Sequence, residues 1–154
     1  MNPLIEALKE SVEEVIGVYT GTPPVLKHYS TRQNEFPLGE ITAIAGLTGE
    51  KVSGAFVVSF SKEALFKILE ALFGSAPAEI TDEVEDAAGE MANMICGAFR
   101  RRFEKQGIPL SASTPSIVTG KDYKLHTLCK SDHLVLEFEL NGHLLALQFC
   151  LDKK

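Results

Sequence analysis

The chain has 154 residues, of which 45% are hydrophobic and 23% charged, and its formal net charge is −6. These values predict one globular domain over residues 1–154, able to bury roughly 70% of the surface that its unfolded chain exposes. The negative charge argues against a nucleic-acid partner, which needs clustered cations, and no apolar run reaches the roughly 20 residues that cross a bilayer.

The first segment predicts a helix that begins after residue 2. Asn2 can cap the helix, and Pro3 suits the first turn, where its missing N–H costs nothing. The apolar residues that recur with helical spacing are Leu4, Leu8, Val12, Val15 and Ile16. Glutamates interrupt this segment, so it lacks the basic and apolar regions of a signal peptide. We therefore expect a cytoplasmic protein.

A hairpin and a second helix are predicted next, after a loop that contains two prolines. A short strand is expected at residues 25–29, and two longer strands at 40–45 and 52–60, joined by the turn-rich segment 46–51. Ser61 can cap the helix that follows. Its apolar residues are Ala64, Leu65, Ile68, Leu69, Leu72 and Phe73.

A long helix is predicted from the cap candidate Thr81 to about Gln106, before Gly107. One face is apolar throughout and would pack on the core. Its residues are Val84, Ala87, Ala88, Met91, Met94, Ile95, Ala98 and Phe99.

A polar stripe lies roughly opposite that face, at about 100° per residue. It holds Glu90, Asn93 and Gly97, together with Asp86 and Arg101. An ordinary solvated helix face would also carry a glutamate, but asparagine is a mediocre helix former, and a glycine costs up to about 1 kcal/mol relative to alanine. Small residues flank the pair: Gly89, Ala92, Cys96 and Gly97. Close packing against another element is the alternative explanation of the glycines.

The last third predicts further antiparallel strands. Asn141-Gly142 is a favoured two-residue hairpin turn, which would pair residues 134, 136 and 138 with 149, 147 and 145 on one face. Residues 116–119 and 125–130 are two more expected strands. The predicted fold is therefore α/β of the α+β kind: an antiparallel sheet flanked by long helices, in two halves that each begin with a helix.

Metal, disulfide and phosphate-binding sites find little support in the composition. The three cysteines are odd in number and show no C-x-x-C spacing, so neither a disulfide framework nor a zinc site is expected. The four histidines show no H-x-x-x-H pattern. The basic cluster at 100–102 lies at a helix end, where cations complement the helix dipole.

The segment Asp86-x-x-x-Glu90-x-x-Asn93, followed by Pro115, resembles the signature of the CheC/CheX/FliY phosphatases of bacterial chemotaxis. The resemblance extends to three other segments: the opening helix, residues 46–60 and residues 114–120. It is closest to the CheX type, because CheC-type members carry a second Glu-x-x-Asn on the first helix, where this chain has Glu13 and then Ile16.

This resemblance implies an α/β domain that dimerises through sheet strands and acts on the phospho-aspartate of a CheY-like receiver. Asn93 would enter the receiver's site and orient the attacking water, and Glu90 would pair with the receiver's lysine. Asp86, Gly89 and Gly97 would lie at the docking surface. The chain itself would bind no metal or cofactor, since Mg²⁺ belongs to the receiver.

Other functions stay open on the sequence alone. The main alternative is a non-catalytic module that binds a receiver or acts as a scaffold. A flagellar-switch component related to FliY is a second. A hydrolase of small molecules is the least supported, because the sequence shows no Ser/His/Asp, Cys/His or metal constellation.

Overall fold

The computed structural model describes residues 2–126 and 128–154, which form three helices and one seven-stranded sheet. No helix in this described part combines the length and the apolar character needed to cross a membrane. The elements in chain order are α1 (Pro3–Thr20), β1 (Val25–Arg32), β2 (Ile41–Thr48), β3 (Val52–Phe60), α2 (Lys62–Phe73), α3 (Asp82–Lys105), β4 (Ser111–Ala112), β5 (Ser116–Thr119), β6 (His133–Leu140) and β7 (His143–Lys153).

All three predicted helix caps are confirmed. The side chain of Asn2 accepts a hydrogen bond from the Ile5 N–H at 2.8 Å. Ser61 and Thr81 accept in the same way from the backbone three residues on, at 3.2 and 3.3 Å. Each cap satisfies an N–H that the helix cannot bond internally. Each helix start is therefore determined by a cap side chain and a backbone N–H that lie within one turn of each other.

The sheet confirms the expectation of two halves. Its order is β1-β6-β7-β3-β2-β4, with β5 also paired to β2. Exchanging β3 with β7, β2 with β6 and β1 with β5 reproduces the pairings, all of them antiparallel. Each half thus contributes a leading helix, a strand that crosses to the other half's hairpin, and a hairpin of its own. In this relation α1 corresponds to α3.

The C-terminal hairpin has the predicted register. Leu134, Leu136 and Phe138 lie opposite Phe149, Leu147 and Leu145. The turn residues Asn141 and Gly142 both have positive φ, 52° and 80°. A two-residue turn of this kind matches the twist of the strands.

Several strand predictions were wrong in extent. Strand β2 continues to Thr48, so its turn is shorter than the predicted 46–51 segment, and β1 continues to Arg32. The strand predicted at 125–130 is absent from the described part of that range, and Thr127 lies outside the described residues. Strand β4, which was not predicted, is only two residues long and pairs with the end of β2. Such a short pairing depends on a distant strand rather than on local pattern.

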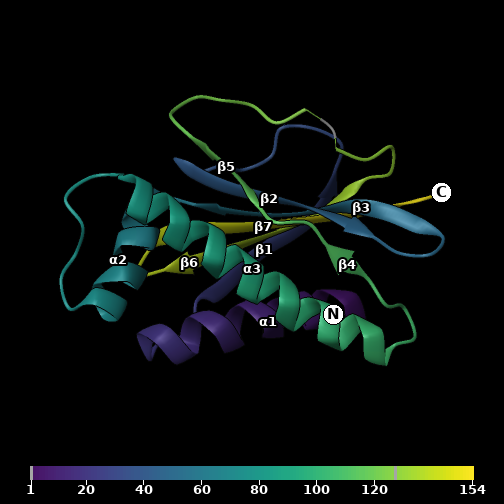
Figure 1. Cartoon of the computed structure of the whole chain (residues 1–154), viewed down its shortest axis with the longest axis horizontal. Helices are drawn as coiled ribbons and strands as arrows, with labels where there is room; N and C mark the ends of the chain where they lie inside the picture. Colours follow the sequence, from purple (N-terminus) through teal and green to yellow (C-terminus); the bar gives the residue numbers. More distant parts are fainter. Residues whose placement is uncertain (1, 127) are drawn as a thin grey trace.

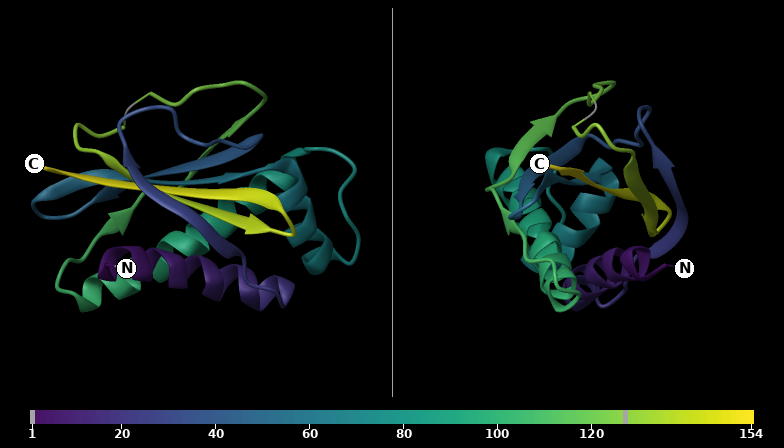
Figure 2. Two further views of the ribbon diagram at one scale, coloured as in Figure 1. Left: turned by 180° about the vertical axis from the view of Figure 1, so that it is seen from behind. Right: turned by 90° about the vertical axis from the view of Figure 1, so that its right-hand side faces the viewer.

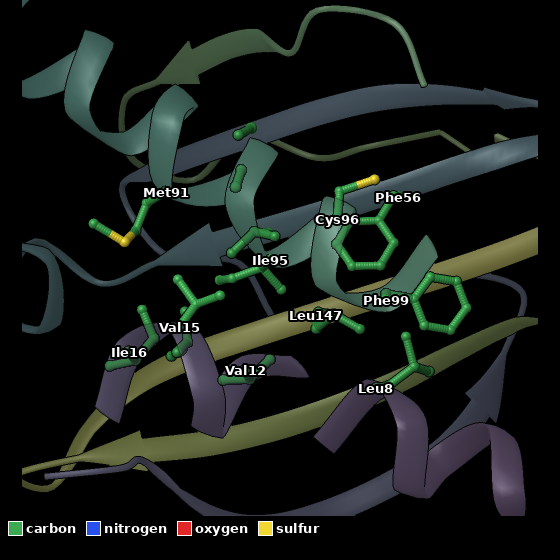
Figure 3. Close-up of a cluster of buried hydrophobic side chains, with 14 of the residues drawn as sticks. Leu8, Val12, Val15, Ile16, Phe56, Met91, Ile95, Cys96, Phe99 and Leu147 are labelled. Carbon is green, nitrogen blue, oxygen red and sulfur yellow. The ribbon is translucent and has the colours of Figure 1, made fainter. Parts of the chain in front are cut away.

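The main core lies between the sheet and the two long helices. Figures 1 and 2 show α1 and α3 against one face of the sheet, with α2 near one end. In Figure 3, side chains from α1, α3 and the strands meet there, among them Val12, Ile95 and Leu147. Leu72 and Phe73, expected on the buried stripe of α2, are instead 36% and 53% exposed, because they lie in its last turn.

The opposite face of the sheet is covered by loops. Segments 33–40 and 120–126 pass over it in Figures 1 and 2. Tyr123 contacts the hydroxyl of Thr42 and donates to the Gly39 carbonyl at 2.5 Å, while Thr42 and Ser59 are hydrogen-bonded at 2.7 Å. The sheet is thus buried on both faces, one apolar and helical and the other partly polar.

Candidate functional site

The polar stripe of α3 faces away from the core, as the helical phase predicted. Glu90, Asn93, Asp86 and Arg101 are all exposed. Residues three apart on a helix are neighbours, with Cβ atoms about 5–6 Å apart, so the Glu90 carboxylate and the Asn93 carboxamide can reach the same molecule. Neither side chain is hydrogen-bonded or ion-paired to any other described residue. Both are therefore available to a partner.

Asn93 also lines a shallow hollow between α1 and α3, with a volume of about 390 Å³. Glu90 does not line it and lies one turn earlier on the helix. The hollow's walls combine apolar and charged groups from both helices. They are Glu14, Val15, Val18, Tyr19, Asn93, Met94, Gly97, Arg100 and Arg101.

Ion pairs fix one end of this hollow. Glu14 on α1 pairs with Arg101 at 3.3 Å and with Arg102 at 2.8 Å, and Glu10 pairs with Arg102 at 3.6 Å. The hydrogen bond from Arg102 is the main reason that the pKa of Glu14 lies below its usual value. Arg101 and Arg102 belong to the basic cluster near the C-terminal end of α3, and through Glu14 they also join α3 to α1.

Gly89 and Gly97, the two glycines near the pair, have different surroundings. A Cβ at Gly89 would lie 3.3 Å from the Ile117 Cδ1 on β5, tighter than ordinary contact, so this glycine permits close packing of helix and strand. A Cβ at Gly97 would meet only arginine side-chain ends, at 3.8 and 4.0 Å. The packing alternative thus explains Gly89, whereas Gly97 faces the hollow.

Two of the small residues thought to flank the pair are not at the surface. Ala92 is 4% exposed and Cys96 1%, and Figure 3 shows Cys96 turned inward beside Phe56. Burial raises the pKa of the Cys96 thiol, which Arg100 offsets only in part. The prediction was wrong because β5 and the strands cover more of α3 than a single apolar stripe suggests.

The cysteine prediction was also wrong. Cys129 and Cys150 form a disulfide, with their Cα atoms 6.2 Å apart. Cys129 lies in the loop before β6 and Cys150 on β7, 21 residues later. Within the described residues, these two cysteines and His133 make up the one group of three that could hold a metal ion. The group lies on the loop-covered face, away from the α3 stripe.

Sequence reasoning missed the contribution of α1 to the site. Val18 is 78% exposed beside Asn93, and the hydroxyl of Tyr19 lies 3.3 Å from the sulfur of Met94. The available signal was that Val18 lies about 160° around the helix axis from Ile16, at the margin of the apolar stripe. An exposed valine next to a free carboxamide extends the surface onto the second helix.

An antiparallel sheet built from two helix-led halves, with one outward Glu-x-x-Asn pair on its longest helix, defines the class of CheC/CheX-like domains. The comparisons agree. Residues 41–139 match the model of the family described as chemotaxis phosphatase CheX. The chain therefore belongs to the CheX family, which confirms the resemblance seen in its motifs.

A relative supports the same family, and solved structures share the fold. The chain is 31% identical over 128 residues to the CheY-P phosphatase CheX of Thermotoga maritima, covering 81% of this chain and 78% of that protein. A CheC-like superfamily protein from Shewanella sp. PV-4 shares the fold with a TM-score of 0.91, at 20% identity and 99% coverage of both chains. The CheX–CheY–BeF₃–Mg²⁺ complex from Borrelia burgdorferi matches with a TM-score of 0.79 and 19% identity, over 96% of this chain and 97% of that one.

Proposed function

We propose that this chain is a phosphatase that hydrolyses the phospho-aspartate of a CheY-type receiver in chemotaxis signalling. Its membership of the CheX family and its 31% identity to a CheY-P phosphatase support this activity. The observation that carries the proposal is the exposed pair of Glu90 and Asn93, free of partners among the described residues, on the helix that bears the family's motif.

The substrate decides what such a phosphatase has to supply. An acyl phosphate is intrinsically labile, so the helper needs to place a water in line with the bond that breaks and to hold the two proteins in register. The receiver brings its own Mg²⁺ and lysine. The Borrelia burgdorferi complex, which contains CheX, CheY and Mg²⁺ together, supports a partner of this kind.

Asn93 is proposed to orient the attacking water. A carboxamide donates and accepts hydrogen bonds at once and does not titrate, so it can hold a water in one orientation across the physiological pH range. Asn93 is exposed at the rim of the α1–α3 hollow, and no described side chain competes for its oxygen or nitrogen. Its position allows it to project into a neighbouring protein's site.

Glu90 is proposed to pair with the receiver's active-site lysine. It lies on the same side of α3 as Asn93, about 60° away around the helix axis. A carboxylate that meets an ammonium in a partly desolvated interface makes a charge-assisted hydrogen bond. That bond would set the distance at which Asn93 enters, and Asp86 and Gly97 would lie at the edge of the same contact.

The test follows the decay of a phosphorylated CheY-type receiver with and without the protein. We expect faster decay with the wild type, a loss on the order of 100-fold of that stimulation for Asn93→Ala, and wild-type stimulation for Asn34→Ala, which removes an exposed carboxamide from the β1–β2 loop. Binding of the receiver with unchanged decay would instead support the non-catalytic scaffold.

The remaining expectations are proposals of the same kind. We infer that residues 1–154 act as one phosphatase domain, in the cytoplasm and as a homodimer. An edge strand supports the dimer: within the described residues β1 pairs only with β6, and most of its side chains are exposed. Sedimentation at two concentrations tests it, with a single monomeric species as the contrary result.

A further inference from the structure

The Cys129–Cys150 disulfide lies beside a buried histidine, His133, on the loop-covered face of the sheet. Cys129, Cys150 and His133 are 5%, 2% and 1% exposed, and one ligand atom from each lies within 4.8 Å of the other two. Cys150 and Gln148 are two apart on β7 and share a face, while Phe149 between them points into the main core. The cluster is therefore separated by the sheet from the Glu90/Asn93 stripe.

His133 is arranged as a metal-binding histidine would be. Its Nδ1 lies 3.2 Å from Oε1 of Gln148, and with the amide in this orientation Nδ1 is the donor, which leaves the lone pair of the neutral ring on Nε2. Nε2 is buried and has no hydrogen-bond partner among the described residues. The ring also stacks on Phe36, with centroids 4.6 Å apart. Metal-ligating histidines characteristically donate their other N–H to a neighbouring acceptor in this way.

Hydrogen bonds also join the two segments that carry Cys129 and Cys150. The carboxylate of Asp152 on β7 accepts from the backbone N–H groups of Lys130 and Ser131 at 2.7 and 2.9 Å. The hydroxyl of Ser131 also donates to the Leu151 carbonyl at 2.9 Å. These bonds hold the residues just after Cys129 against the strand that carries Cys150, so reduction would leave the two thiols side by side.

We propose that reduction of the Cys129–Cys150 disulfide opens a buried Zn²⁺ site formed by the two sulfurs and His133. An external dithiol supplies two electrons, the S–S bond breaks, both cysteines become thiols, and the dithiol leaves as a disulfide. Zn²⁺ then binds two thiolates and the imidazole, and the two thiol protons pass to solvent. The inference departs from the expectation that this chain binds no metal, and it does not depend on the proposed phosphatase activity.

The chemistry of the three ligands selects the ion. Two thiolates and an imidazole are ligands for Zn²⁺ rather than for Mg²⁺ or Ca²⁺. Two thiolates also neutralise the charge of the ion, which lowers the cost of burying it. Zn–S bonds of about 2.3 Å in a tetrahedral site place two sulfurs about 3.8 Å apart. The fourth position is left for water.

The test uses Co²⁺ as a spectroscopic probe of the full chain, fully reduced and kept without oxygen. We expect one Co²⁺ per chain, a sulfur-to-cobalt charge-transfer band in the near ultraviolet, displacement of that band by Zn²⁺, and release of two protons per metal ion. The oxidised protein is expected to show no band. This comparison needs no variant, so it does not depend on the folding of a mutant. A reduced protein without the band would overturn the proposal.

Variants separate the proposed ligands from other cysteines and histidines. We expect Cys96→Ser and His143→Ala to keep the band, since Cys96 lies on α3 and His143 is exposed at the start of β7. Cys150→Ser and His133→Ala should lose it, and Gln148→Leu should weaken Zn²⁺ binding by on the order of 10- to 100-fold. A band that survives Cys150→Ser and His133→Ala would show that the metal binds elsewhere and would refute the site.

Discussion

The two long helices occupy corresponding places in the two halves of the sheet, yet only one carries the proposed site. On α3, Glu90 and Asn93 face solvent and have no partner among the described residues. On α1, the exposed side chains at corresponding helical spacing include Glu14, which is held by two arginines of α3. The same scaffold thus presents a free carboxamide on one helix and an internal ion pair on the other.

The structure gives a different reason why α1 lacks a second Glu-x-x-Asn pair. Sequence reasoning compared Glu13 and Ile16 with a second Glu-x-x-Asn, but Ile16 is fully buried in the core and could not serve as a surface position. The outward pair at that spacing is Glu14 and Gly17, and no asparagine occurs in α1. Helix α1 instead pairs with α3 through Glu14, and its exposed Val18 lines the same hollow as Asn93.

The largest effect on stability is expected for a substitution at Ile16, which is buried in α1. Ile16→Asn should lower the free energy of unfolding by about 4 kcal/mol, because it removes buried apolar contacts and buries an unpaired carboxamide. Val18→Asn, two residues away and 78% exposed, should change it by less than about 0.5 kcal/mol. Urea unfolding of both variants tests this, and equal effects would contradict the assigned phase of α1.

A smaller effect is expected from Glu90 on α3. Glu90→Ala should raise the phospho-receiver concentration for half-maximal stimulation about tenfold, because it removes one hydrogen bond to a charged group. It should lower the maximal rate less than Asn93→Ala does. Glu83→Ala is the matched control, since Glu83 is exposed in the first turn of the same helix. A loss confined to the maximal rate would contradict a role in docking.

The smallest effect is expected from the ion pair between the helices. The folded-state pKa of Glu14 lies below its unfolded value because Arg102 binds the carboxylate. Its stabilisation is therefore fully present above the unfolded pKa and is lost as the pH falls through the lower, folded one. Glu14→Gln should cost less than about 1 kcal/mol at pH 7, since the pair is partly exposed. Comparing unfolding at pH 7 and in acid checks it: the cost should shrink in acid, and a constant cost would contradict the assignment.

Local signals predicted the parts of the fold that depend on neighbouring residues. The caps at Asn2, Ser61 and Thr81 and the Asn141-Gly142 turn all act within a few residues, and the outward phase of Glu90 and Asn93 follows from helix geometry alone. The conclusions that failed depend on distant segments.

Distant contacts explain those failures. The Cys129–Cys150 bond joins residues 21 apart, and no spacing rule on three cysteines identifies such a pair. Gly89 packs against Ile117, and Ala92 and Cys96 are covered by other elements. The prediction that these residues flank the pair at the surface assumed that α3 has only one buried side. The contribution of Val18 needed the position of α1 beside α3.

The proposed catalysis depends on one carboxamide, Asn93. The direct measurement is the decay rate of a phosphorylated CheY-type receiver with the wild type, with Asn93→Ala and with a double variant. The double variant combines Asn93→Ala with Gly17→Asn, which adds a carboxamide three residues after Glu14. A Cβ at Gly17 would meet Pro23 at an ordinary 3.6 Å, so the position accepts a side chain. We expect Asn93→Ala to lose on the order of 100-fold of the stimulation, and the second substitution to restore none of it, because Glu14 is already bound by Arg101 and Arg102. Full stimulation by a folded Asn93→Ala variant would contradict the proposed role of Asn93.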